Sequence, residues 1–481
     1  MDQDEAIKNV SFQSDKTRRG ILLSYWIVVL LAIPLWWTTT SITRLPLPEG
    51  RVRSLKSKQL KYELCASLDD DLPKPIATSV KESLRTRIHE LGLNDTVSVD
   101  ILSGTPDEPP EYAVAIDTEE VEARTVGRKL VVGTKSMPSG NVSSTISNIL
   151  EKLWLSSFGA NQQTVQYSPR YRLAFSLMNE DAAAGDCPPS WDVKTAIARQ
   201  IQPVLRRLST LHNFTIESQV QFFAPLAFEP VQLNGGSFGL TQEQLSVFVN
   251  SAEWTLSSSV SNDPVLHFVI FVPSASRRPL RILDDEGSPT ESNAFVIPQW
   301  GSIFIHNPSS PSSESHLSPR ELYPAFSVFR AQLLSLLGVA PLPPSVKSGE
   351  TVSDWQLDAL LRRRAYENAE GSKDTLASIV SLVHQIEGMP VGKDVTEDVG
   401  GALDALDLMY SVVRDSPQLT LQYSAKALTR ASRAFFNPGM LALLYFPPEH
   451  NLAVYTPLLA PVAVPLLAAV MREAIRWRRS R

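Results

Sequence analysis

Two side chains in this sequence could act as nucleophiles, Ser237 and Cys187. Ser237 lies within 235–239, which matches the Gly-x-Ser-x-Gly nucleophile elbow, where a helix begins at the serine. The capping-box pattern at 241–244 predicts that the next helix begins several residues later, so a glycine-rich loop is the better interpretation. Cys187 is followed by two prolines, which prevent the helix N-terminus that usually lowers the pKa of a catalytic thiol. A lumenal hydrolase that uses Ser237 or Cys187 is therefore kept only as the alternative hypothesis.

Residues that would bind a metal ion or a cofactor are not grouped in a familiar motif. The sequence holds no His-Glu-x-x-His, Cys-x-x-Cys, Gly-x-Gly-x-x-Gly or Walker loop, and its 7 histidines are scattered. We therefore expect no cofactor, no metal site and no catalytic residue. The net charge is −6 and the pI is about 5.8, with no large basic block, which argues against nucleic acid as a partner.

Two uncharged apolar runs lie at opposite ends of the 481-residue chain. The first, 21–37, would reach about 25 Å as a helix, which is the short end of the range for a bilayer core. No cleavage site of a signal peptide follows it, so an uncleaved anchor is favoured. The second, 452–471, is followed by five arginines, whereas a removable glycolipid-anchor signal ends in its apolar tail. The sequence thus predicts one transmembrane helix at each end.

The arginines after the second run determine the predicted orientation. One basic residue within twenty precedes this run and five follow it, so the positive-inside rule places the Arg-rich tail, 472–481, in the cytosol. Two spans then place 1–20 in the cytosol as well and leave the intervening region in the lumen or exterior. Three sequons in that region are candidates for N-glycosylation, although such triplets also arise by chance: Asn94, Asn141 and Asn213. Cys65 and Cys187 lie there too, and their spacing allows either one disulfide or two free thiols.

The region between the runs changes character near residue 317. From 38 to 317, β-like runs alternate with helical ones, which is typical of a mixed α/β domain. We expect strands at 61–68, 97–102, 112–116, 129–132, 170–178, 214–223, 265–272, 280–283 and 295–305, and helices at 76–91, 142–158 and 191–211. A polar linker is expected at 309–315. From 318 to 451 we expect a helical layer, which starts with a capping box at 318–321 and includes 354–370, 373–387, 402–414 and 419–435, with Gly371 and Gly388 as C-caps.

Three prolines recur every four residues in the second apolar run: Pro457, Pro461 and Pro465. They would form one stripe of the helix, and each removes a backbone hydrogen bond and leaves a carbonyl that hydrocarbon cannot satisfy. The stripe therefore favours packing against other membrane helices. The general frequency of proline in membrane helices is the alternative explanation.

Several segments together resemble one family, the PIG-S subunit of glycosylphosphatidylinositol (GPI) transamidase. They are 34–40 at the end of the first apolar run and just after it, 44–48, 266–273, 293–303, 443–448 and the proline-spaced second run. The resemblance implies a non-catalytic subunit of the endoplasmic reticulum (ER) membrane complex that attaches GPI anchors to the C-terminus of proteins. It implies as partners a PIG-K-like catalytic chain, PIG-T-like and PIG-U-like chains and a Gaa-type subunit.

Five residues match the family motif within 293–303: Asn293, Phe295, Pro298, Trp300 and Gly301. Their types suggest a structural role. Gly301 would permit a turn or bulge beside Trp300, whose large ring would anchor the sheet.

Overall fold

The structure is a computed structural model, and it describes residues 14–40, 44–69, 74–103, 111–135, 141–158, 164–185, 187–233, 235–256, 261–308, 316–386, 389–441 and 448–479. The linker expected at 309–315 and the C-cap expected at Gly388 lie outside these residues.

The chain divides into two compact units. Unit 1 comprises Met1–Ser57, Ser372–Asp404 and Leu428–Arg481, and unit 2 comprises Lys58–Gly371 and Ala405–Ala427. This division does not follow the boundary expected between 38–317 and 318–451. Helix α9 (Pro319–Leu336) and the part of α10 (Asp354–Gln385) up to Gly371 belong to unit 2, which also contains the sheets.

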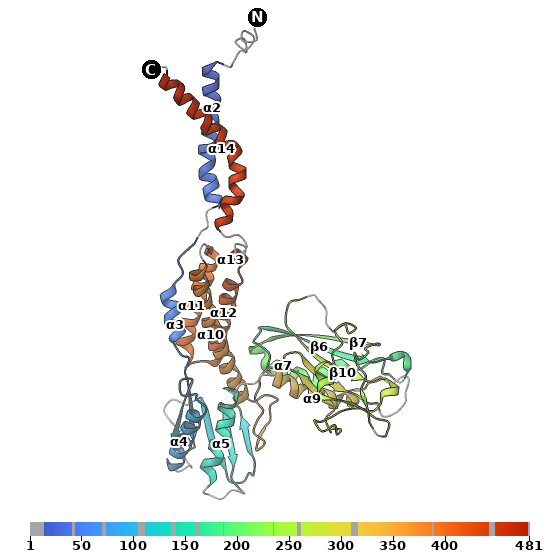
Figure 1. The fold of residues 1–481 in the computed structure, drawn as a ribbon. Helices are drawn as coiled ribbons and strands as arrows, with labels where there is room; N and C mark the ends of the chain where they lie inside the picture. The colour runs from blue at the N-terminus through green and yellow to red at the C-terminus, as the bar shows by residue number, and fades with distance from the viewer. Residues whose placement is uncertain are drawn as a thin grey trace. The chain divides into compact units, whose positions relative to one another are not determined.

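The first sheet of unit 2 has the strand order β14-β4-β5-β3-β1-β2. Strands β1, β2, β3 and β5 run parallel, and the apolar side chains of α4 (Lys74–Glu90) and α5 (Val142–Trp154) form one core cluster with them (Figure 1). The strands are β1 (Tyr62–Leu68), β2 (Val97–Ser103), β3 (Tyr112–Asp117), β4 (Ala123–Val126), β5 (Lys129–Gly133) and β14 (Val346–Ser348). The expected strands and helices of this part are confirmed, and β4 and β14 are additional.

The second sheet of unit 2 has the order β12-β13-β10-β6-β7. Its strands are β6 (Arg170–Asn179), β7 (Asn213–Gln221), β10 (Val265–Val272), β12 (Ala294–Ile297) and β13 (Gly301–Ile305). A small third sheet, β11-β9-β8, consists of β8 (Val231–Gln232), β9 (Phe238–Leu240) and β11 (Leu280–Ile282), and α8 (Gln242–Ser246) follows β9. The mixed α/β class with a helical C-terminal region is therefore confirmed.

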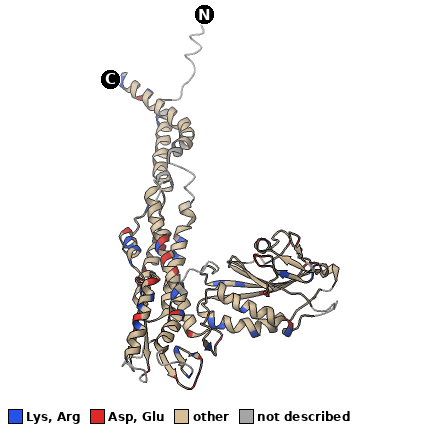
Figure 2. Cartoon of the chain, turned by 60° about the horizontal axis from the view of Figure 1, so that its bottom comes forward, with Lys and Arg blue, Asp and Glu red and all other residues tan. Residues whose placement is uncertain are grey.

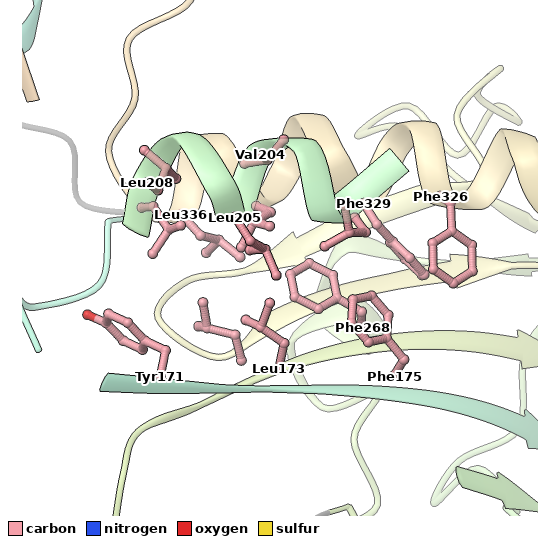
Figure 3. Close-up of a cluster of buried hydrophobic side chains, with 14 of the residues drawn as sticks. Tyr171, Leu173, Phe175, Val204, Leu205, Leu208, Phe268, Phe326, Phe329 and Leu336 are labelled. Carbon is pink, nitrogen blue, oxygen red and sulfur yellow. The ribbon is translucent and has the colours of Figure 1, made fainter. Parts of the chain in front are cut away.

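An aromatic core joins the second sheet to α9 (Figure 3). The ring of Phe175 on β6 stacks on those of Phe268 on β10 and Phe326 on α9, with centroids 5.2 and 5.5 Å apart. All three side chains are fully buried. Helix α9 begins as expected, because Ser318 accepts a hydrogen bond from the Glu321 amide and the Glu321 carboxylate accepts one from the Ser318 amide.

Two expected elements of this part are interrupted. The strand expected at 295–305 is an antiparallel hairpin of β12 and β13. The helix expected at 191–211 consists of α6 (Val193–Ala196), a π-helical turn η5 (Ile197–Ile201), α7 (Gln202–Arg207) and a 3-10 turn (Leu208–Thr210). Pro203 has no N–H to donate to the preceding turn, which accounts for the interruption there.

The helices near the C-terminus are longer than expected. They are α10 (Asp354–Gln385), α11 (Lys393–Val412) and α12 (Pro417–Phe435), and α10 continues through Gly371. The C-cap expected at Gly371 is therefore wrong. One glycine in a helix interior costs about 1 kcal/mol relative to alanine, and burial of flanking residues such as Ala369 and Leu376 offsets this cost. The short helices of unit 1 are α3 (Glu49–Ser57) and α13 (Pro438–Leu441).

The two apolar runs both lie in helices, α2 (Asp15–Thr40) and α14 (Pro448–Arg479), which run side by side (Figure 1). Figure 2 shows long stretches of both helices without charged residues. Over the residues that the structure describes, no helix is both long and apolar enough to cross a membrane. The two segments expected to be transmembrane helices, 21–37 and 452–471, are thus helical, but they are not shown to be membrane spans.

Candidate interaction sites

The family-motif residues lie in and around the β12–β13 hairpin of the second sheet. The carbonyl of Asn293, just before β12, accepts a hydrogen bond from the Ile305 amide at 2.7 Å and so closes the hairpin. Phe295 on β12 contacts the ring of Phe248 edge-to-face at 5.4 Å, and Pro298 is exposed in the turn. These contacts support a structural role for the motif.

Gly301 follows this turn and lies directly against the neighbouring strand. Its φ of 152° lies in a region that other residues rarely adopt, and a Cβ added there would lie 2.0 Å from the carbonyl oxygen of His267. The ring of Trp300 stacks on the His267 ring at 4.7 Å. Trp300 is half-buried and packs at the margin of the core. Gly301 has the separate role of allowing β13 to pair closely with β10.

Substitution of Gly301 with alanine is expected to lower the free energy of unfolding by about 2 kcal/mol, because the new Cβ collides with backbone and the φ becomes strained. Urea unfolding of the detergent-solubilised full chain would measure the change. Gly349 is the control, because it has open space at its Cβ and no positive φ, so Gly349→Ala should shift stability by less than about 0.5 kcal/mol. Equal effects of both substitutions would contradict this account.

Ser237 and Cys187, the two candidate nucleophiles, do not lie in catalytic settings. Ser237 directly precedes strand β9, and the next helix, α8, begins only after Thr241, whose capping box is complete. The arrangement is thus loop–strand–helix, and the strand–serine–helix order of a nucleophile elbow is absent. In the part of the chain that the structure describes, neither the hydroxyl of Ser237 nor the thiol of Cys187 bonds to a histidine or carboxylate side chain.

Cys65 and Cys187 are both free thiols in this structure. Cys65 lies on β1 and is half-buried, and this burial raises the pKa of its thiol. A raised pKa lowers the thiolate fraction at neutral pH and makes Cys65 a poor nucleophile. The described residues include no cluster of histidine, cysteine and acidic side chains that could hold a metal ion.

The three sequon asparagines are all exposed. Asn94 lies in the turn after α4, Asn141 is the N-cap residue of α5, and Asn213 is the first residue of β7. None of them is enclosed by neighbouring residues, so each could carry a glycan.

Helices α2 and α14 form an open groove within unit 1. Its volume is about 440 Å³, and it is lined mainly by apolar side chains: Leu22, Leu23, Trp26, Val470, Ala474 and Trp477. The guanidinium Nε of Arg19 donates to Glu473 Oε1 at 2.6 Å and links the two helices beside this groove. The proline stripe lies elsewhere on α14, where Pro457, Pro461 and Pro465 are all exposed.

One buried polar cluster of unit 2 was not anticipated from the sequence. Asp358 on α10 is 3% exposed, and its carboxylate accepts hydrogen bonds from Arg128 Nε at 2.7 Å and Tyr112 Oη at 2.9 Å. Arg362, one turn later and 4% exposed, donates to Tyr112 Oη at 2.8 Å and to Glu111 Oε2 at 2.7 Å. In the sequence, the only sign of this cluster is the four-residue spacing of Asp358 and Arg362, and the same spacing is typical of ion pairs on a solvated helix surface.

The electrostatics of this cluster fix its protonation states. Burial raises the pKa of Tyr112 well above its usual range, so the phenol remains a donor toward Asp358. The hydrogen bond to Asp358 raises the pKa of Arg128. The cluster joins α10 to the first sheet through the contacts of Asp358 and Arg362 with Tyr112 on β3. We therefore interpret it as structural.

Comparison with known proteins gives a consistent result over nearly the whole chain. Residues 23–480 match the family described as PIG-S, Phosphatidylinositol-glycan biosynthesis class S protein. A bovine protein named GPI-anchor transamidase component PIGS is 29% identical, with 96% of each chain covered. The Schizosaccharomyces pombe GPI transamidase component PIG-S homolog is 28% identical over 99% of this chain and 88% of its own length. The Saccharomyces cerevisiae GPI transamidase component GPI17 is 25% identical over 91% of this chain.

Proposed function

The chain belongs to the PIG-S family, and on this basis we propose that it is a non-catalytic subunit of the GPI transamidase complex. The observation that carries the proposal is the family match over residues 23–480, together with relatives from mammals and yeasts whose names all state a transamidase component. The settings of Ser237 and Cys187 agree with a non-catalytic role, because in the described residues neither side chain is hydrogen-bonded to a histidine or a carboxylate. The nucleophile of the transamidation reaction would then belong to another chain.

The partners follow from this assignment. We infer contacts with a PIG-K-like catalytic chain, PIG-T-like and PIG-U-like chains and a Gaa-type subunit in the ER membrane. Purification of the tagged full chain in mild detergent, followed by identification of co-purifying chains, tests this directly. Recovery of these subunits supports the proposal, and recovery of the chain alone would refute it.

A double substitution separates this function from the alternative hydrolase. If the chain is an accessory subunit, Ser237→Ala with Cys187→Ala should leave both the recovered complex and its transamidation activity unchanged. A complex that assembles normally but loses activity in this variant would support a catalytic role. The double variant is informative because both residues lie outside the buried cores, and Ser237 precedes β9 in a loop.

We further propose that α2 and α14 anchor the chain in the ER membrane, with both termini in the cytosol. The support is the uncharged sequence of both runs and the exposure of their apolar side chains. On α2, Leu31 and Leu35 are 71% and 68% exposed, and on α14, Val464 is 62% exposed. Apolar side chains this exposed are unfavourable in water and favourable in lipid. Resistance to alkaline carbonate extraction would support the anchors, and complete extraction would contradict them.

Glycosylation reports on the same topology. Because 38–451 would face the lumen, endoglycosidase treatment should increase the electrophoretic mobility of the chain, and Asn94→Gln, Asn141→Gln or Asn213→Gln should each remove the shift of an occupied site. Asn9 also begins a sequon, Asn9-Val10-Ser11, but it would lie in the cytosol, so Asn9→Gln is the control and should change nothing. A shift that disappears with Asn9→Gln would reverse the proposed orientation.

The proline stripe of α14 is proposed to pack against a membrane helix of another subunit. Replacement of Pro457, Pro461 and Pro465 with leucine should lower the recovery of partner subunits several-fold, because it restores the backbone hydrogen bonds and fills the stripe. Replacement of Val454, Val462 and Val464 with leucine is the matched control on the same helix. Unchanged recovery of the complex in the proline variant would contradict the packing role.

A further inference from the structure

Unit 1 carries two exposed apolar side chains at the end where α11 begins and α12 ends. At this end, Arg433 Nε on α12 donates to Asp398 Oδ2 on α11 at 2.5 Å. The Leu45 amide donates to the carbonyl of Val391, just before α11, at 3.0 Å. Phe436, directly after α12, is 68% exposed, and Leu45 is 40% exposed. We call these two side chains the apolar tip.

The ring of Phe436 is held on the outside of this end by its neighbours. The ring of Phe435 is half-buried and contacts it edge-to-face at 5.0 Å, and Met440 of α13 is buried. Single exposed apolar side chains are common on proteins and need no special explanation. The exposure of Leu45 and Phe436 therefore gains meaning only from their place in the chain.

Two short connections tie the apolar tip to the helices proposed as membrane anchors. Three residues, 41–43, separate α2 from Arg44, and six, 442–447, separate α13 from α14. Even fully extended, these connections reach at most about 14 Å and about 25 Å. In the proposed topology, both connections leave the membrane on its lumenal side. The tip is therefore confined to the neighbourhood of the lumenal membrane surface.

This confinement favours lipid as the occupant of the tip. A covalent connection raises the effective concentration of the two linked surfaces, so that even a weak contact is populated. Apolar side chains bind at the boundary between headgroups and acyl chains, where their burial is favourable. A partner subunit would have to reach a place that the chain already holds beside the bilayer.

We propose that the apolar tip rests on the lumenal membrane surface, with the side chains of Leu45 and Phe436 inserted among the lipid headgroups. The partner is thus the lipid surface itself, and neutral lipid suffices, because the recognition is apolar. This inference rests on the proposed membrane placement of α2 and α14, but not on membership of the transamidase complex.

The test uses the full chain in phosphatidylcholine nanodiscs, with and without lipid that carries a nitroxide quencher at its headgroup. Phe436→Cys, in a chain that also carries Cys65→Ser and Cys187→Ser, takes a fluorophore at the tip. Asp404→Cys in the same background is the control, because its side chain is 67% exposed. Quenching at Phe436→Cys should exceed that of the control at least about threefold, because Asp404 lies about 16 Å along α11 from the first residue of that helix.

Leu45→Cys provides a second, independent position at the tip and should be quenched as strongly as Phe436→Cys. The inference is overturned if either position is quenched no more than Asp404→Cys. It is also overturned if a photo-cross-linker on Phe436→Cys captures another subunit and no lipid in the purified complex. Quenching at both positions in a chain that recovers no transamidase subunit would support this inference while refuting the proposed function. A chain that recovers the subunits without quenching would do the reverse.

Discussion

Replacing Asp358 with alanine is expected to lower the free energy of unfolding by about 3 kcal/mol, because the substitution leaves a buried Arg–Tyr network without its acceptor. Asp358 receives three hydrogen bonds, from Arg128 Nε, from Arg128 Nη2 at 3.0 Å and from Tyr112 Oη. The hydroxyl of Tyr112 would then have to remain buried with one of its partners missing. The loss should appear as a lower urea midpoint for the detergent-solubilised full chain, followed by tryptophan fluorescence.

Asp404 provides a matched control for this prediction. It also pairs with an arginine, since Arg51 Nη2 donates to its carboxylate at 2.9 Å, but its side chain is 67% exposed. Exposed ion pairs contribute little, so Asp404→Ala should change the stability by less than about 1 kcal/mol. If Asp358→Ala unfolds at the same urea concentration as Asp404→Ala, the buried network does not stabilise the fold more than an exposed ion pair does.

Replacing Phe175 with alanine is expected to lower the free energy of unfolding by about 4 kcal/mol, because the ring lies at the centre of the aromatic core. Its loss opens a cavity between Phe268 and Phe326, which come from a different strand and from α9 and cannot both move inward. Thermal unfolding monitored by near-ultraviolet circular dichroism would report the loss of this packing.

Phe223 is the control for this substitution. It lies just beyond the end of β7 and is 61% exposed, so Phe223→Ala removes a ring without creating a cavity. Its effect should stay below about 0.5 kcal/mol. A cost for Phe175→Ala that is no larger than for Phe223→Ala would mean that the sheet and α9 do not form one packed core.

The sequence predicted the regular parts of this fold well because its apolar residues repeat at the period of each element. The buried alternation Tyr62, Leu64, Ala66 and Leu68 marks β1, and the capping box at Ser318 marks the start of α9. Strands β4 and β14 have four and three residues, which is too short for a periodic signal, and their pairing joins Ala123 to Val346. Gly371 was misread because local propensity cannot reveal the burial around it.

The candidate sites were predictable to different degrees. Gly301 could be assigned a structural role from its residue type beside Trp300, and its contact with the His267 backbone gives this role its physical reason. The Asp358 network was not predictable, because Asp358 and Arg362 on a helix have the spacing of an ordinary surface pair. Only the packing of α10 against β3 shows that both side chains are buried.

The strand order of the first sheet has a consequence for the way this chain is synthesised. Two separate segments of the chain build the core of this sheet. The first runs from β1 to α5, residues 62–154, and the second contains β14 and Trp355, whose ring centroid lies 4.3 Å from that of Tyr112. The whole second sheet and α9 lie between these two parts in the chain, so they form an insertion between the segments that build the first sheet. A ribosome must therefore extend nearly two hundred residues beyond α5 before the first sheet can close. During that interval the unpaired edge of β4 and the uncovered Tyr112 are exposed to chaperones.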